Sequence, residues 1–127
     1  MDRPLVDTQS FLWYGEANPR LKPELRMLIA NSRPILSIAS LWEIAIKSSI
    51  GKLNLYKPFD EMAHTIEAAG FTILPITPSH LVELHQLPFH HHDPFDRLII
   101  AQSLADGLPI VTSDDWFESY GAAIIKT

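Results

Sequence analysis

The sequence DPFDRLIIAQSLADGLPIVTSD, residues 93–114, decides the fold class because it joins one helix to one buried strand. Asp93 is a favourable N-cap before a proline and Gly107 is a typical helix stop, so we predict a helix between them. The apolar run 108–112 follows at once without polar alternation, which is typical of a strand buried on both faces. Asp114 lies just beyond this strand. The stretch therefore predicts one helix–strand unit of an α/β protein, with an acidic residue at its end.

The same alternation of short apolar runs and helical patterns extends along the chain. Strands are predicted over residues 5–6, 35–38, 71–74, 108–112 and 122–125. Helices or helical turns are predicted over residues 11–14, 22–31, 40–50, 58–69, 78–87, 93–107 and 114–120. At the start of the helix over 40–50, Ser40 is the predicted N-cap and Glu43 completes a capping box. Continuous apolar strands separated by helices predict an α/β fold with three layers, α/β/α, around a short and mainly parallel central sheet.

Length and composition exclude several classes of protein. The chain of 127 residues fits a single domain, 1–127, and without cysteine it has no disulfide scaffold, thiolate zinc site or cysteine nucleophile. No apolar run approaches the roughly 18 residues that span a bilayer, so we expect no membrane partner. The cysteine-free composition is consistent with a cytoplasmic location. The net charge of −5 disfavours bulk electrostatic binding of nucleic acid, because phosphate contacts usually depend on Lys and Arg.

Four acidic residues are predicted to meet at one edge of this sheet. Asp7 directly follows the first predicted strand, and Asp114 follows the fourth. Glu43 and Asp96 lie in the first turns of predicted helices. In an open α/β sheet, ligands bind beyond the carboxyl ends of the strands. Helix dipoles also favour acids in first turns by about 0.3–1 kcal/mol, so each acid except Asp7 could be an ordinary cap. Asp7 is different, because a carboxylate at the end of a buried strand needs a partner or a cation.

A group of carboxylates with few bases suits a hard divalent cation. Magnesium takes oxygen ligands, keeps several waters and usually binds through a few carboxylates and a substrate phosphate. Such a site can activate water for in-line displacement at phosphorus without a protein nucleophile. Fifteen acids against ten bases give the chain its negative charge, and four of those acids are the predicted ligands. Bound cations would then supply the positive charge that a phosphate needs, which weakens the objection to a nucleic-acid substrate.

Several stretches together resemble a known family: LVDT (5–8), SLWEIAIK (40–47) with GKL (51–53), LPI (74–76), DPFDRLIIAQ (93–102) and VTSD (111–114). They closely resemble the PIN domain family and, within it, the VapC-type toxins of bacterial type II toxin–antitoxin pairs. The resemblance runs in order from residue 5 to about residue 120. The blocks WEIAIK (42–47) and DPFDR (93–97) are its specific parts, and the fold that it implies is a compact, PIN-like α/β/α domain.

The resemblance also implies an activity and a set of partners. It implies a hydrolase, an endoribonuclease that depends on one or two Mg²⁺ or Mn²⁺ ions and cleaves RNA phosphodiester bonds. The implied metal ligands and catalytic residues are Asp7, Glu43, Asp96 and Asp114, acting directly or through water. A cognate antitoxin that inserts a segment into the active-site groove is implied, as is a homodimer.

The sequence departs from the family pattern at two positions near these acids. Gln9 stands where many relatives have histidine, so any role of that histidine is absent here. Asp115 doubles the last acid and could share or replace the role of Asp114, which we prefer because it matches the family spacing from the strand. Asp93 recurs in the motif, and its simplest role is the N-cap of the following helix.

Further residues are weaker predictions. Lys47, Lys52 and Arg97 are candidates for holding RNA phosphate, although each could equally be an ordinary surface or paired residue, and Lys47 could simply pair with Glu43 four positions earlier. Hydroxyl contacts to substrate are predicted for Thr112 and Ser113. The run of histidines at 90–92 is predicted to be a solvated loop, because consecutive residues do not easily converge on one ion.

Two other functions stay open at this point. One is a catalytically degenerate PIN-like module whose acidic edge binds a partner protein. The other is an aspartyl-phosphate phosphatase or receiver that uses Asp7 as its nucleophile. Against the latter, the stretch Asp7–Gln9 lacks the second acid two residues on that such phosphatases carry.

Overall fold

The computed structural model describes residues 3–125, so the outer ends of the predicted domain, residues 1–2 and 126–127, lie outside the described residues. The strands are β1 (Leu5–Val6), β2 (Ile35–Ser37), β3 (Thr72–Leu74), β4 (Ile110–Val111) and β5 (Ile124–Ile125). The helices are α1 (Thr8–Gly15), α2 (Pro23–Ala30), α3 (Ile38–Ser49), α4 (Phe59–Thr65), α5 (Pro78–Gln86), α6 (Pro94–Asp106) and the 3-10 helix η1 (Asp115–Tyr120). Among the described residues, no helix is long and apolar enough to cross a membrane.

The strands form one five-stranded sheet in the order β3-β2-β1-β4-β5, and every pairing is parallel. The sequence predicts a mainly parallel sheet, and in the structure all pairings between the described strands are parallel. The first three strands extend the sheet in one direction and the last two extend it in the other. The order therefore reverses between β1 and β4, and open α/β sheets bind ligands in the crevice at such a point.

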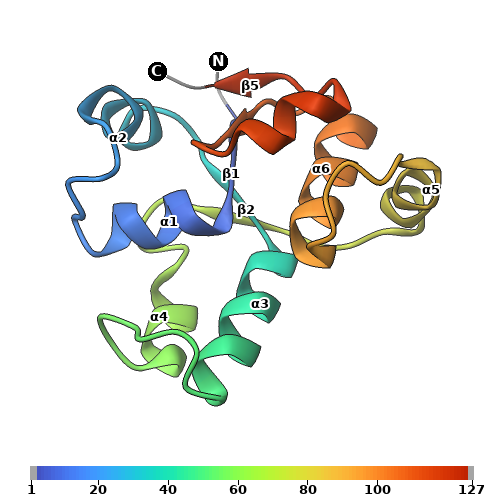
Figure 1. The fold of residues 1–127 in the computed structure, drawn as a ribbon. Helices are drawn as coiled ribbons and strands as arrows, with labels where there is room; N and C mark the ends of the chain where they lie inside the picture. The colour runs from blue at the N-terminus through green and yellow to red at the C-terminus, as the bar shows by residue number, and fades with distance from the viewer. Residues whose placement is uncertain (1–2, 126–127) are drawn as a thin grey trace.

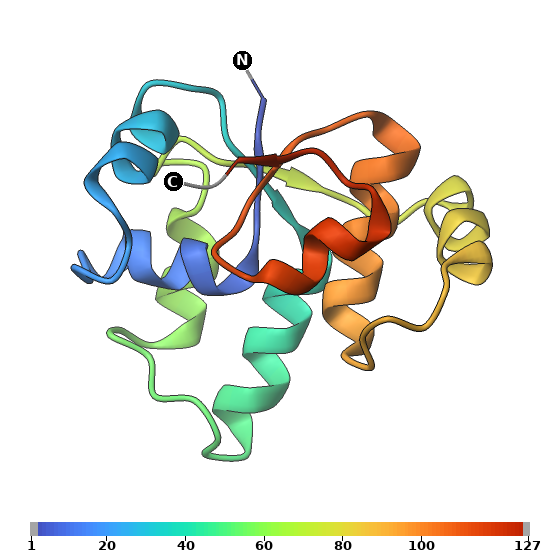
Figure 2. The ribbon, with the colours of Figure 1, turned by 45° about the horizontal axis from the view of Figure 1, so that its top comes forward.

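Helices cover both faces of this sheet, as the three-layer prediction requires. Neighbouring residues on a strand point to opposite faces, so Val6, Leu36 and Val111 join a core formed with α1, α2 and α4. Their neighbours in β1, β2 and β4 join a second core formed with α6 and η1. Figures 1 and 2 show α1 and α2 on one side of the sheet and α5 and α6 on the other.

The start of α3 corrects one prediction. The helix begins at Ile38 rather than Ser40, and its N-cap is Ser37, whose hydroxyl accepts a hydrogen bond from the Ala39 amide. The last residue of β2 thus caps the helix directly, with no turn between strand and helix. Ser40 instead accepts a 2.8 Å hydrogen bond from the Thr8 hydroxyl. The predicted capping box is therefore wrong, and Glu43 lies beyond the first turn.

The first and fourth helices also differ from prediction. The helical turn predicted over 11–14 is a full helix, α1, because Asp7 caps it by accepting a 2.8 Å hydrogen bond from the Ser10 amide. Helix α4 ends at Thr65, earlier than the predicted 58–69. For α6 the predicted ends are confirmed: the Asp93 carboxylate accepts from the amides of the first turn, and Gly107 adopts a left-handed φ of 66°.

Candidate metal centre

A cavity of about 340 Å³ lies at the carboxyl ends of the central strands, and all four predicted acids line it. Asp7 follows β1, Asp114 follows β4, Glu43 comes from α3 and Asp96 from α6. The other lining residues are Thr8, Gln9, Leu12, Ile44, Lys47, Leu53, Asp93 and Ser113. The fold thus brings together four carboxylates that are distant in sequence, at the place where the strand order reverses.

Asp7 lines this cavity, and hydrogen bonds hold both of its carboxylate oxygens. Its Oδ1 accepts from the Ser10 amide at 2.8 Å, and its Oδ2 accepts from the Thr112 hydroxyl at 2.6 Å. Burial raises the pKa of the carboxyl, the hydrogen bonds from Ser10 and Thr112 lower it, and the charge of Asp114 raises it again. Together these effects raise the pKa of Asp7 above its ordinary value. A cation bound nearby would favour the ionised carboxylate and lower this pKa again.

Glu43 shows that the site fits a cation. The residue is 7% exposed, and its Oε2 accepts a 2.6 Å hydrogen bond from Lys47 Nζ, which forms an ion pair. Its Oε1 is buried and has no hydrogen-bond partner within residues 3–125. A buried polar atom without a partner costs free energy, and a carboxylate oxygen beside a cavity that four other acids line is a good ligand for Mg²⁺ or Mn²⁺. The residues present therefore fit the metal that the resemblance implies.

The carboxylate of Asp96 is repelled by the other negative charges of the cavity. The residue occupies the first turn of α6, and the pKa of its carboxyl is raised to about 7 with burial as the largest cause. The negative charges of Asp93, Glu43 and Asp7 contribute to this raised pKa, and a hydrogen bond from His91 acts against it. Crowded carboxylates with so high a pKa mark a site that a divalent cation would stabilise.

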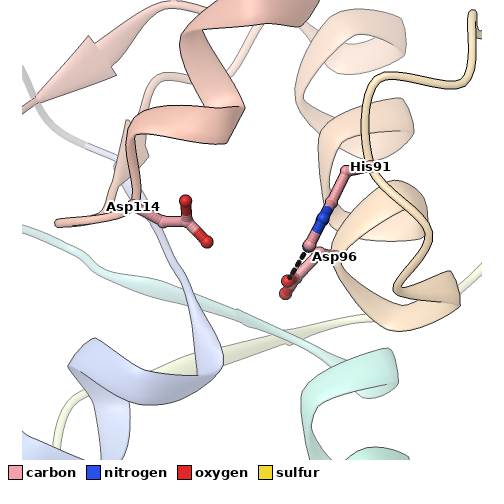
Figure 3. A group of neighbouring side chains, drawn as sticks. All are labelled: His91, Asp96 and Asp114. Carbon is pink, nitrogen blue, oxygen red and sulfur yellow. Dashed lines mark hydrogen bonds and ion pairs between the residues drawn. The ribbon is translucent and has the colours of Figure 1, made fainter.

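Asp114 comes from the opposite side of the cavity. It is the N-cap of η1, where its Oδ1 accepts from the Trp116 amide at 2.9 Å. Figure 3 shows its carboxylate facing Asp96 and His91, and ligand atoms of these three residues lie within 4.8 Å of one another. Asp115 is exposed in the first turn of η1 and is not among the residues that line the cavity. The geometry favours Asp114 as the fourth acid.

The predicted substrate contacts separate into two kinds. Thr112 is buried, and its hydroxyl donates to Asp7 and accepts from the Asp114 amide at 3.0 Å, so it positions acids instead of facing the substrate. Ser113 is exposed and lines the cavity. Lys47 also lines the cavity with a half-exposed side chain. Its pKa is raised mainly by the hydrogen bond with Glu43, which is the pairing that the helical spacing had suggested.

Arg97 has a structural role in place of the predicted phosphate contact. The side chain is buried, and its Nη1 donates to the Pro88 carbonyl at 2.9 Å and to the Tyr120 hydroxyl at 3.3 Å. Its guanidinium carbon lies 4.0 Å from the centroid of the Phe89 ring. These contacts connect α6 to the loop that precedes it and to η1.

His91 is the site residue that sequence reasoning missed. His90 and His92 are exposed, as expected for a solvated loop, but His91 is partly buried. Its Nε2 forms a 3.0 Å hydrogen bond with Oδ2 of Asp96. The loop folds back over the start of α6 and brings His91 to Asp96. The sequence signal that could have indicated this contact is a histidine shortly before the Asp-Pro pair that begins the helix.

With this geometry established, the chain can be placed among known proteins. The model of the PIN domain family matches residues 5–123. The chain therefore belongs to the PIN domain family. The search of curated proteins found no match.

Solved structures show the same fold at low sequence identity. A chain of the VapBC2 structure from Rickettsia felis, solved with a DNA fragment from the promoter, has a TM-score of 0.72 at 15% identity, with 97% of each chain covered. A chain of the DNA-bound VapBC structure from Salmonella typhimurium has a TM-score of 0.70 at 18% identity, with 98% of each chain covered. A chain from the Neisseria gonorrhoeae FitAcB structure has a TM-score of 0.65 at 19% identity, with 96% of each chain covered.

Proposed function

We propose that this PIN domain is a metal-dependent endoribonuclease, and that it acts as the VapC-like toxin of a type II toxin–antitoxin pair. The observation that carries the proposal is the buried Oε1 of Glu43, which has no hydrogen-bond partner within residues 3–125, on a residue that lines the cavity together with four further acids. Membership of a family of nucleases supports hydrolysis of nucleic acid as the reaction.

The four acids would hold one or two Mg²⁺ or Mn²⁺ ions, which supply Lewis-acid charge for in-line displacement at phosphorus. The protein contributes the geometry. The hydroxyl of Thr112 and the amide of Ser10 fix Asp7, and η1 fixes Asp114 through its N-cap. Lys47 keeps one oxygen of Glu43 in place, and the other oxygen has no hydrogen-bond partner within residues 3–125. Exposed Ser113, at the cavity, is the proposed hydroxyl contact to RNA.

The partners are proposed on the same basis. The chain shares its fold with proteins solved in VapBC and FitAB structures, which supports a cognate antitoxin as the partner. We propose that the antitoxin occupies the cavity edge, that the protein forms a homodimer, and that it acts in the cytoplasm, where its RNA substrate is found.

The hydrogen bonds of Asp7 disfavour the aspartyl-phosphate alternative. Both carboxylate oxygens accept hydrogen bonds, and the residue is only 6% exposed. A hydrogen-bonded carboxylate oxygen keeps a lone pair that can bind a metal ion, whereas a nucleophilic oxygen must also be reached in line by the phosphorus of a substrate. No contact among the site's described residues argues against the other alternative, a catalytically degenerate module that only binds a partner. An RNA cleavage assay distinguishes this module from a nuclease.

Purified protein should cleave end-labelled, mixed-sequence, single-stranded RNA when Mg²⁺ or Mn²⁺ is present, and EDTA should stop the reaction. Asp7→Asn and Asp114→Asn should each lower the rate by more than about 100-fold, since even the partners of metal ligands contribute 10- to 100-fold. Asp60→Asn is the matched control, because Asp60 is an exposed acid in the first turn of α4. Metal binding without cleavage of any RNA would indicate the degenerate module, and cleavage that survives EDTA and both substitutions would overturn the metal mechanism.

A further inference from the structure

The imidazole of His91 is held in place by contacts on several sides. Its ring stacks on the indole of Trp116, with centroids 5.8 Å apart and an interplanar angle of 10°. The backbone amide of His91 donates to the Tyr120 hydroxyl at 2.8 Å. Its Nε2 is hydrogen-bonded to Oδ2 of Asp96 at 3.0 Å, and its side chain is 23% exposed. A histidine in a merely solvated loop would have none of this support.

The loop that carries His91 is itself fixed to the body of the domain. The Tyr120 hydroxyl also accepts from the His90 amide at 3.0 Å and from Nη1 of Arg97. Arg97, from α6, binds the Pro88 carbonyl at the start of the same loop. Tyr120 and Arg97 therefore hold the backbone of the loop that carries the imidazole.

The imidazole nitrogen is placed where a metal ligand would be. Ligand atoms of His91, Asp96 and Asp114 lie within 4.8 Å of one another (Figure 3). Two adjacent ligands of an octahedral ion with bonds of about 2.1 Å are separated by about 3.0 Å. The separation between Nε2 of His91 and Oδ2 of Asp96 has that value. A cation bound to both atoms would replace the hydrogen bond that joins them and keep their separation.

A second observation indicates a ligand in the same place. Glu43 Oε1 is buried without a hydrogen-bond partner in the described chain, and Glu43 lines the same cavity as Asp96 and Asp114. The acids alone would suit Mg²⁺ and Mn²⁺ almost equally. A nitrogen ligand changes this balance, because imidazole suits transition-metal ions whereas Mg²⁺ prefers oxygen.

We propose that His91 is a further protein ligand of the metal centre, that its Nε2 binds the same cation as Asp96, and that this ligand makes the site prefer Mn²⁺ and Co²⁺ to Mg²⁺. The inference rests on the proposed function, because it assigns a ligand to the metal centre of that function. It also gives the histidine run a role in metal choice.

The direct test is pulsed electron paramagnetic resonance on the full-length protein loaded with Mn²⁺. A coordinated imidazole should give nitrogen coupling to the manganese, and isotope-labelled histidine should change that coupling without any substitution. The coupling should disappear in His91→Phe, which keeps an aromatic ring against Trp116, and should persist in His92→Ala, the exposed neighbour. Thermal unfolding of each variant shows whether it is folded, and the labelling experiment stands even where a variant is not.

Calorimetric titration with Mn²⁺ and with Mg²⁺ tests the preference. His91→Phe should lower the affinity for Mn²⁺ by about tenfold or more and change the affinity for Mg²⁺ much less, whereas His92→Ala should change neither. If the unaltered protein binds Mn²⁺ and cleaves RNA but shows no nitrogen coupling, the assignment of His91 is overturned and the metal centre is not. If it binds neither ion, both proposals are wrong.

Discussion

The Thr112 hydroxyl donates a 2.6 Å hydrogen bond to Oδ2 of Asp7, joining residues 105 positions apart in the chain. The two residues follow β4 and β1, the neighbouring strands between which the sheet order reverses. The same hydroxyl accepts from the Asp114 amide, so one side chain orients one acid and the backbone of another. The sheet, more than the loops, therefore sets the geometry of the candidate metal centre.

Replacing Thr112 with valine removes this hydroxyl and keeps the shape of the side chain. We expect the affinity for Mn²⁺ to fall by about 10- to 100-fold, because partners of metal ligands contribute that much. The free energy of unfolding should fall by about 1–3 kcal/mol, because Asp7 loses a buried partner. Calorimetry and urea denaturation measure the two effects. Ser113→Ala serves as control for the adjacent exposed hydroxyl, and unchanged Mn²⁺ affinity in Thr112→Val would show that the hydrogen bond does not support the site.

The stability of the metal-free protein should decrease as the pH rises from about 4 to about 7. The pKa of Asp96 is raised from 3.8 to about 7, and burial also raises that of Asp7. A carboxyl whose pKa is higher in the folded state favours folding below its unfolded pKa, and this contribution is lost as the pH rises through the folded pKa. We expect a loss of about 1–4 kcal/mol, from roughly 1.4 kcal/mol per pKa unit. Thermal unfolding in EDTA across this range measures it, and a stability that rises instead would contradict the account.

Asp96→Asn removes the charge that crowds the cavity. At pH 8 and in EDTA, the variant should unfold at a higher temperature than the unaltered protein, since Asp93, Glu43 and Asp7 no longer repel a fourth charge. Added Mn²⁺ should raise the unfolding temperature of the unaltered protein and leave the variant nearly unchanged. Differential scanning calorimetry with and without Mn²⁺ provides both comparisons. A variant that is still stabilised by the metal would mean that Asp96 is not a ligand.

Tyr120→Phe removes the hydroxyl that holds the histidine loop. The amides of His90 and His91 and the guanidinium of Arg97 lose a shared acceptor, so the free energy of unfolding should fall by about 1–3 kcal/mol. Hydrogen exchange at the two amides should become faster, and Mn²⁺ affinity should fall with the loss of ring position. The matched control is Tyr56→Phe, which alters a more exposed tyrosine. Unchanged amide exchange would contradict the role given to Tyr120.

The sequence predicted the parts of the site that depend on local patterns. Asp7 and Asp114 each follow a short buried strand, and Asp93 precedes a proline at a helix start, so neighbouring residues sufficed to place them. The start of α3 was wrong because Ser37 and Ser40 both suit an N-cap, and only the end of β2 decides between them.

Residues whose role depends on tertiary contacts could not be assigned. Arg97 is buried because Tyr120, from η1, and Phe89, from the preceding loop, meet it in three dimensions. His91 approaches Asp96 because the same loop folds back over α6. In both cases the sequence shows the residue type, and the loop conformation decides what it contacts.

Anomalous diffraction from crystals soaked in Mn²⁺ tests the central claim most directly, because it locates the ion without reference to activity. We predict one or two manganese peaks in the cavity, with oxygens of Asp7, Glu43, Asp96 and Asp114 bound directly or through water at about 2.2 Å for direct bonds. A manganese peak elsewhere on the protein, with none in this cavity, would contradict the assignment of these acids as a metal centre.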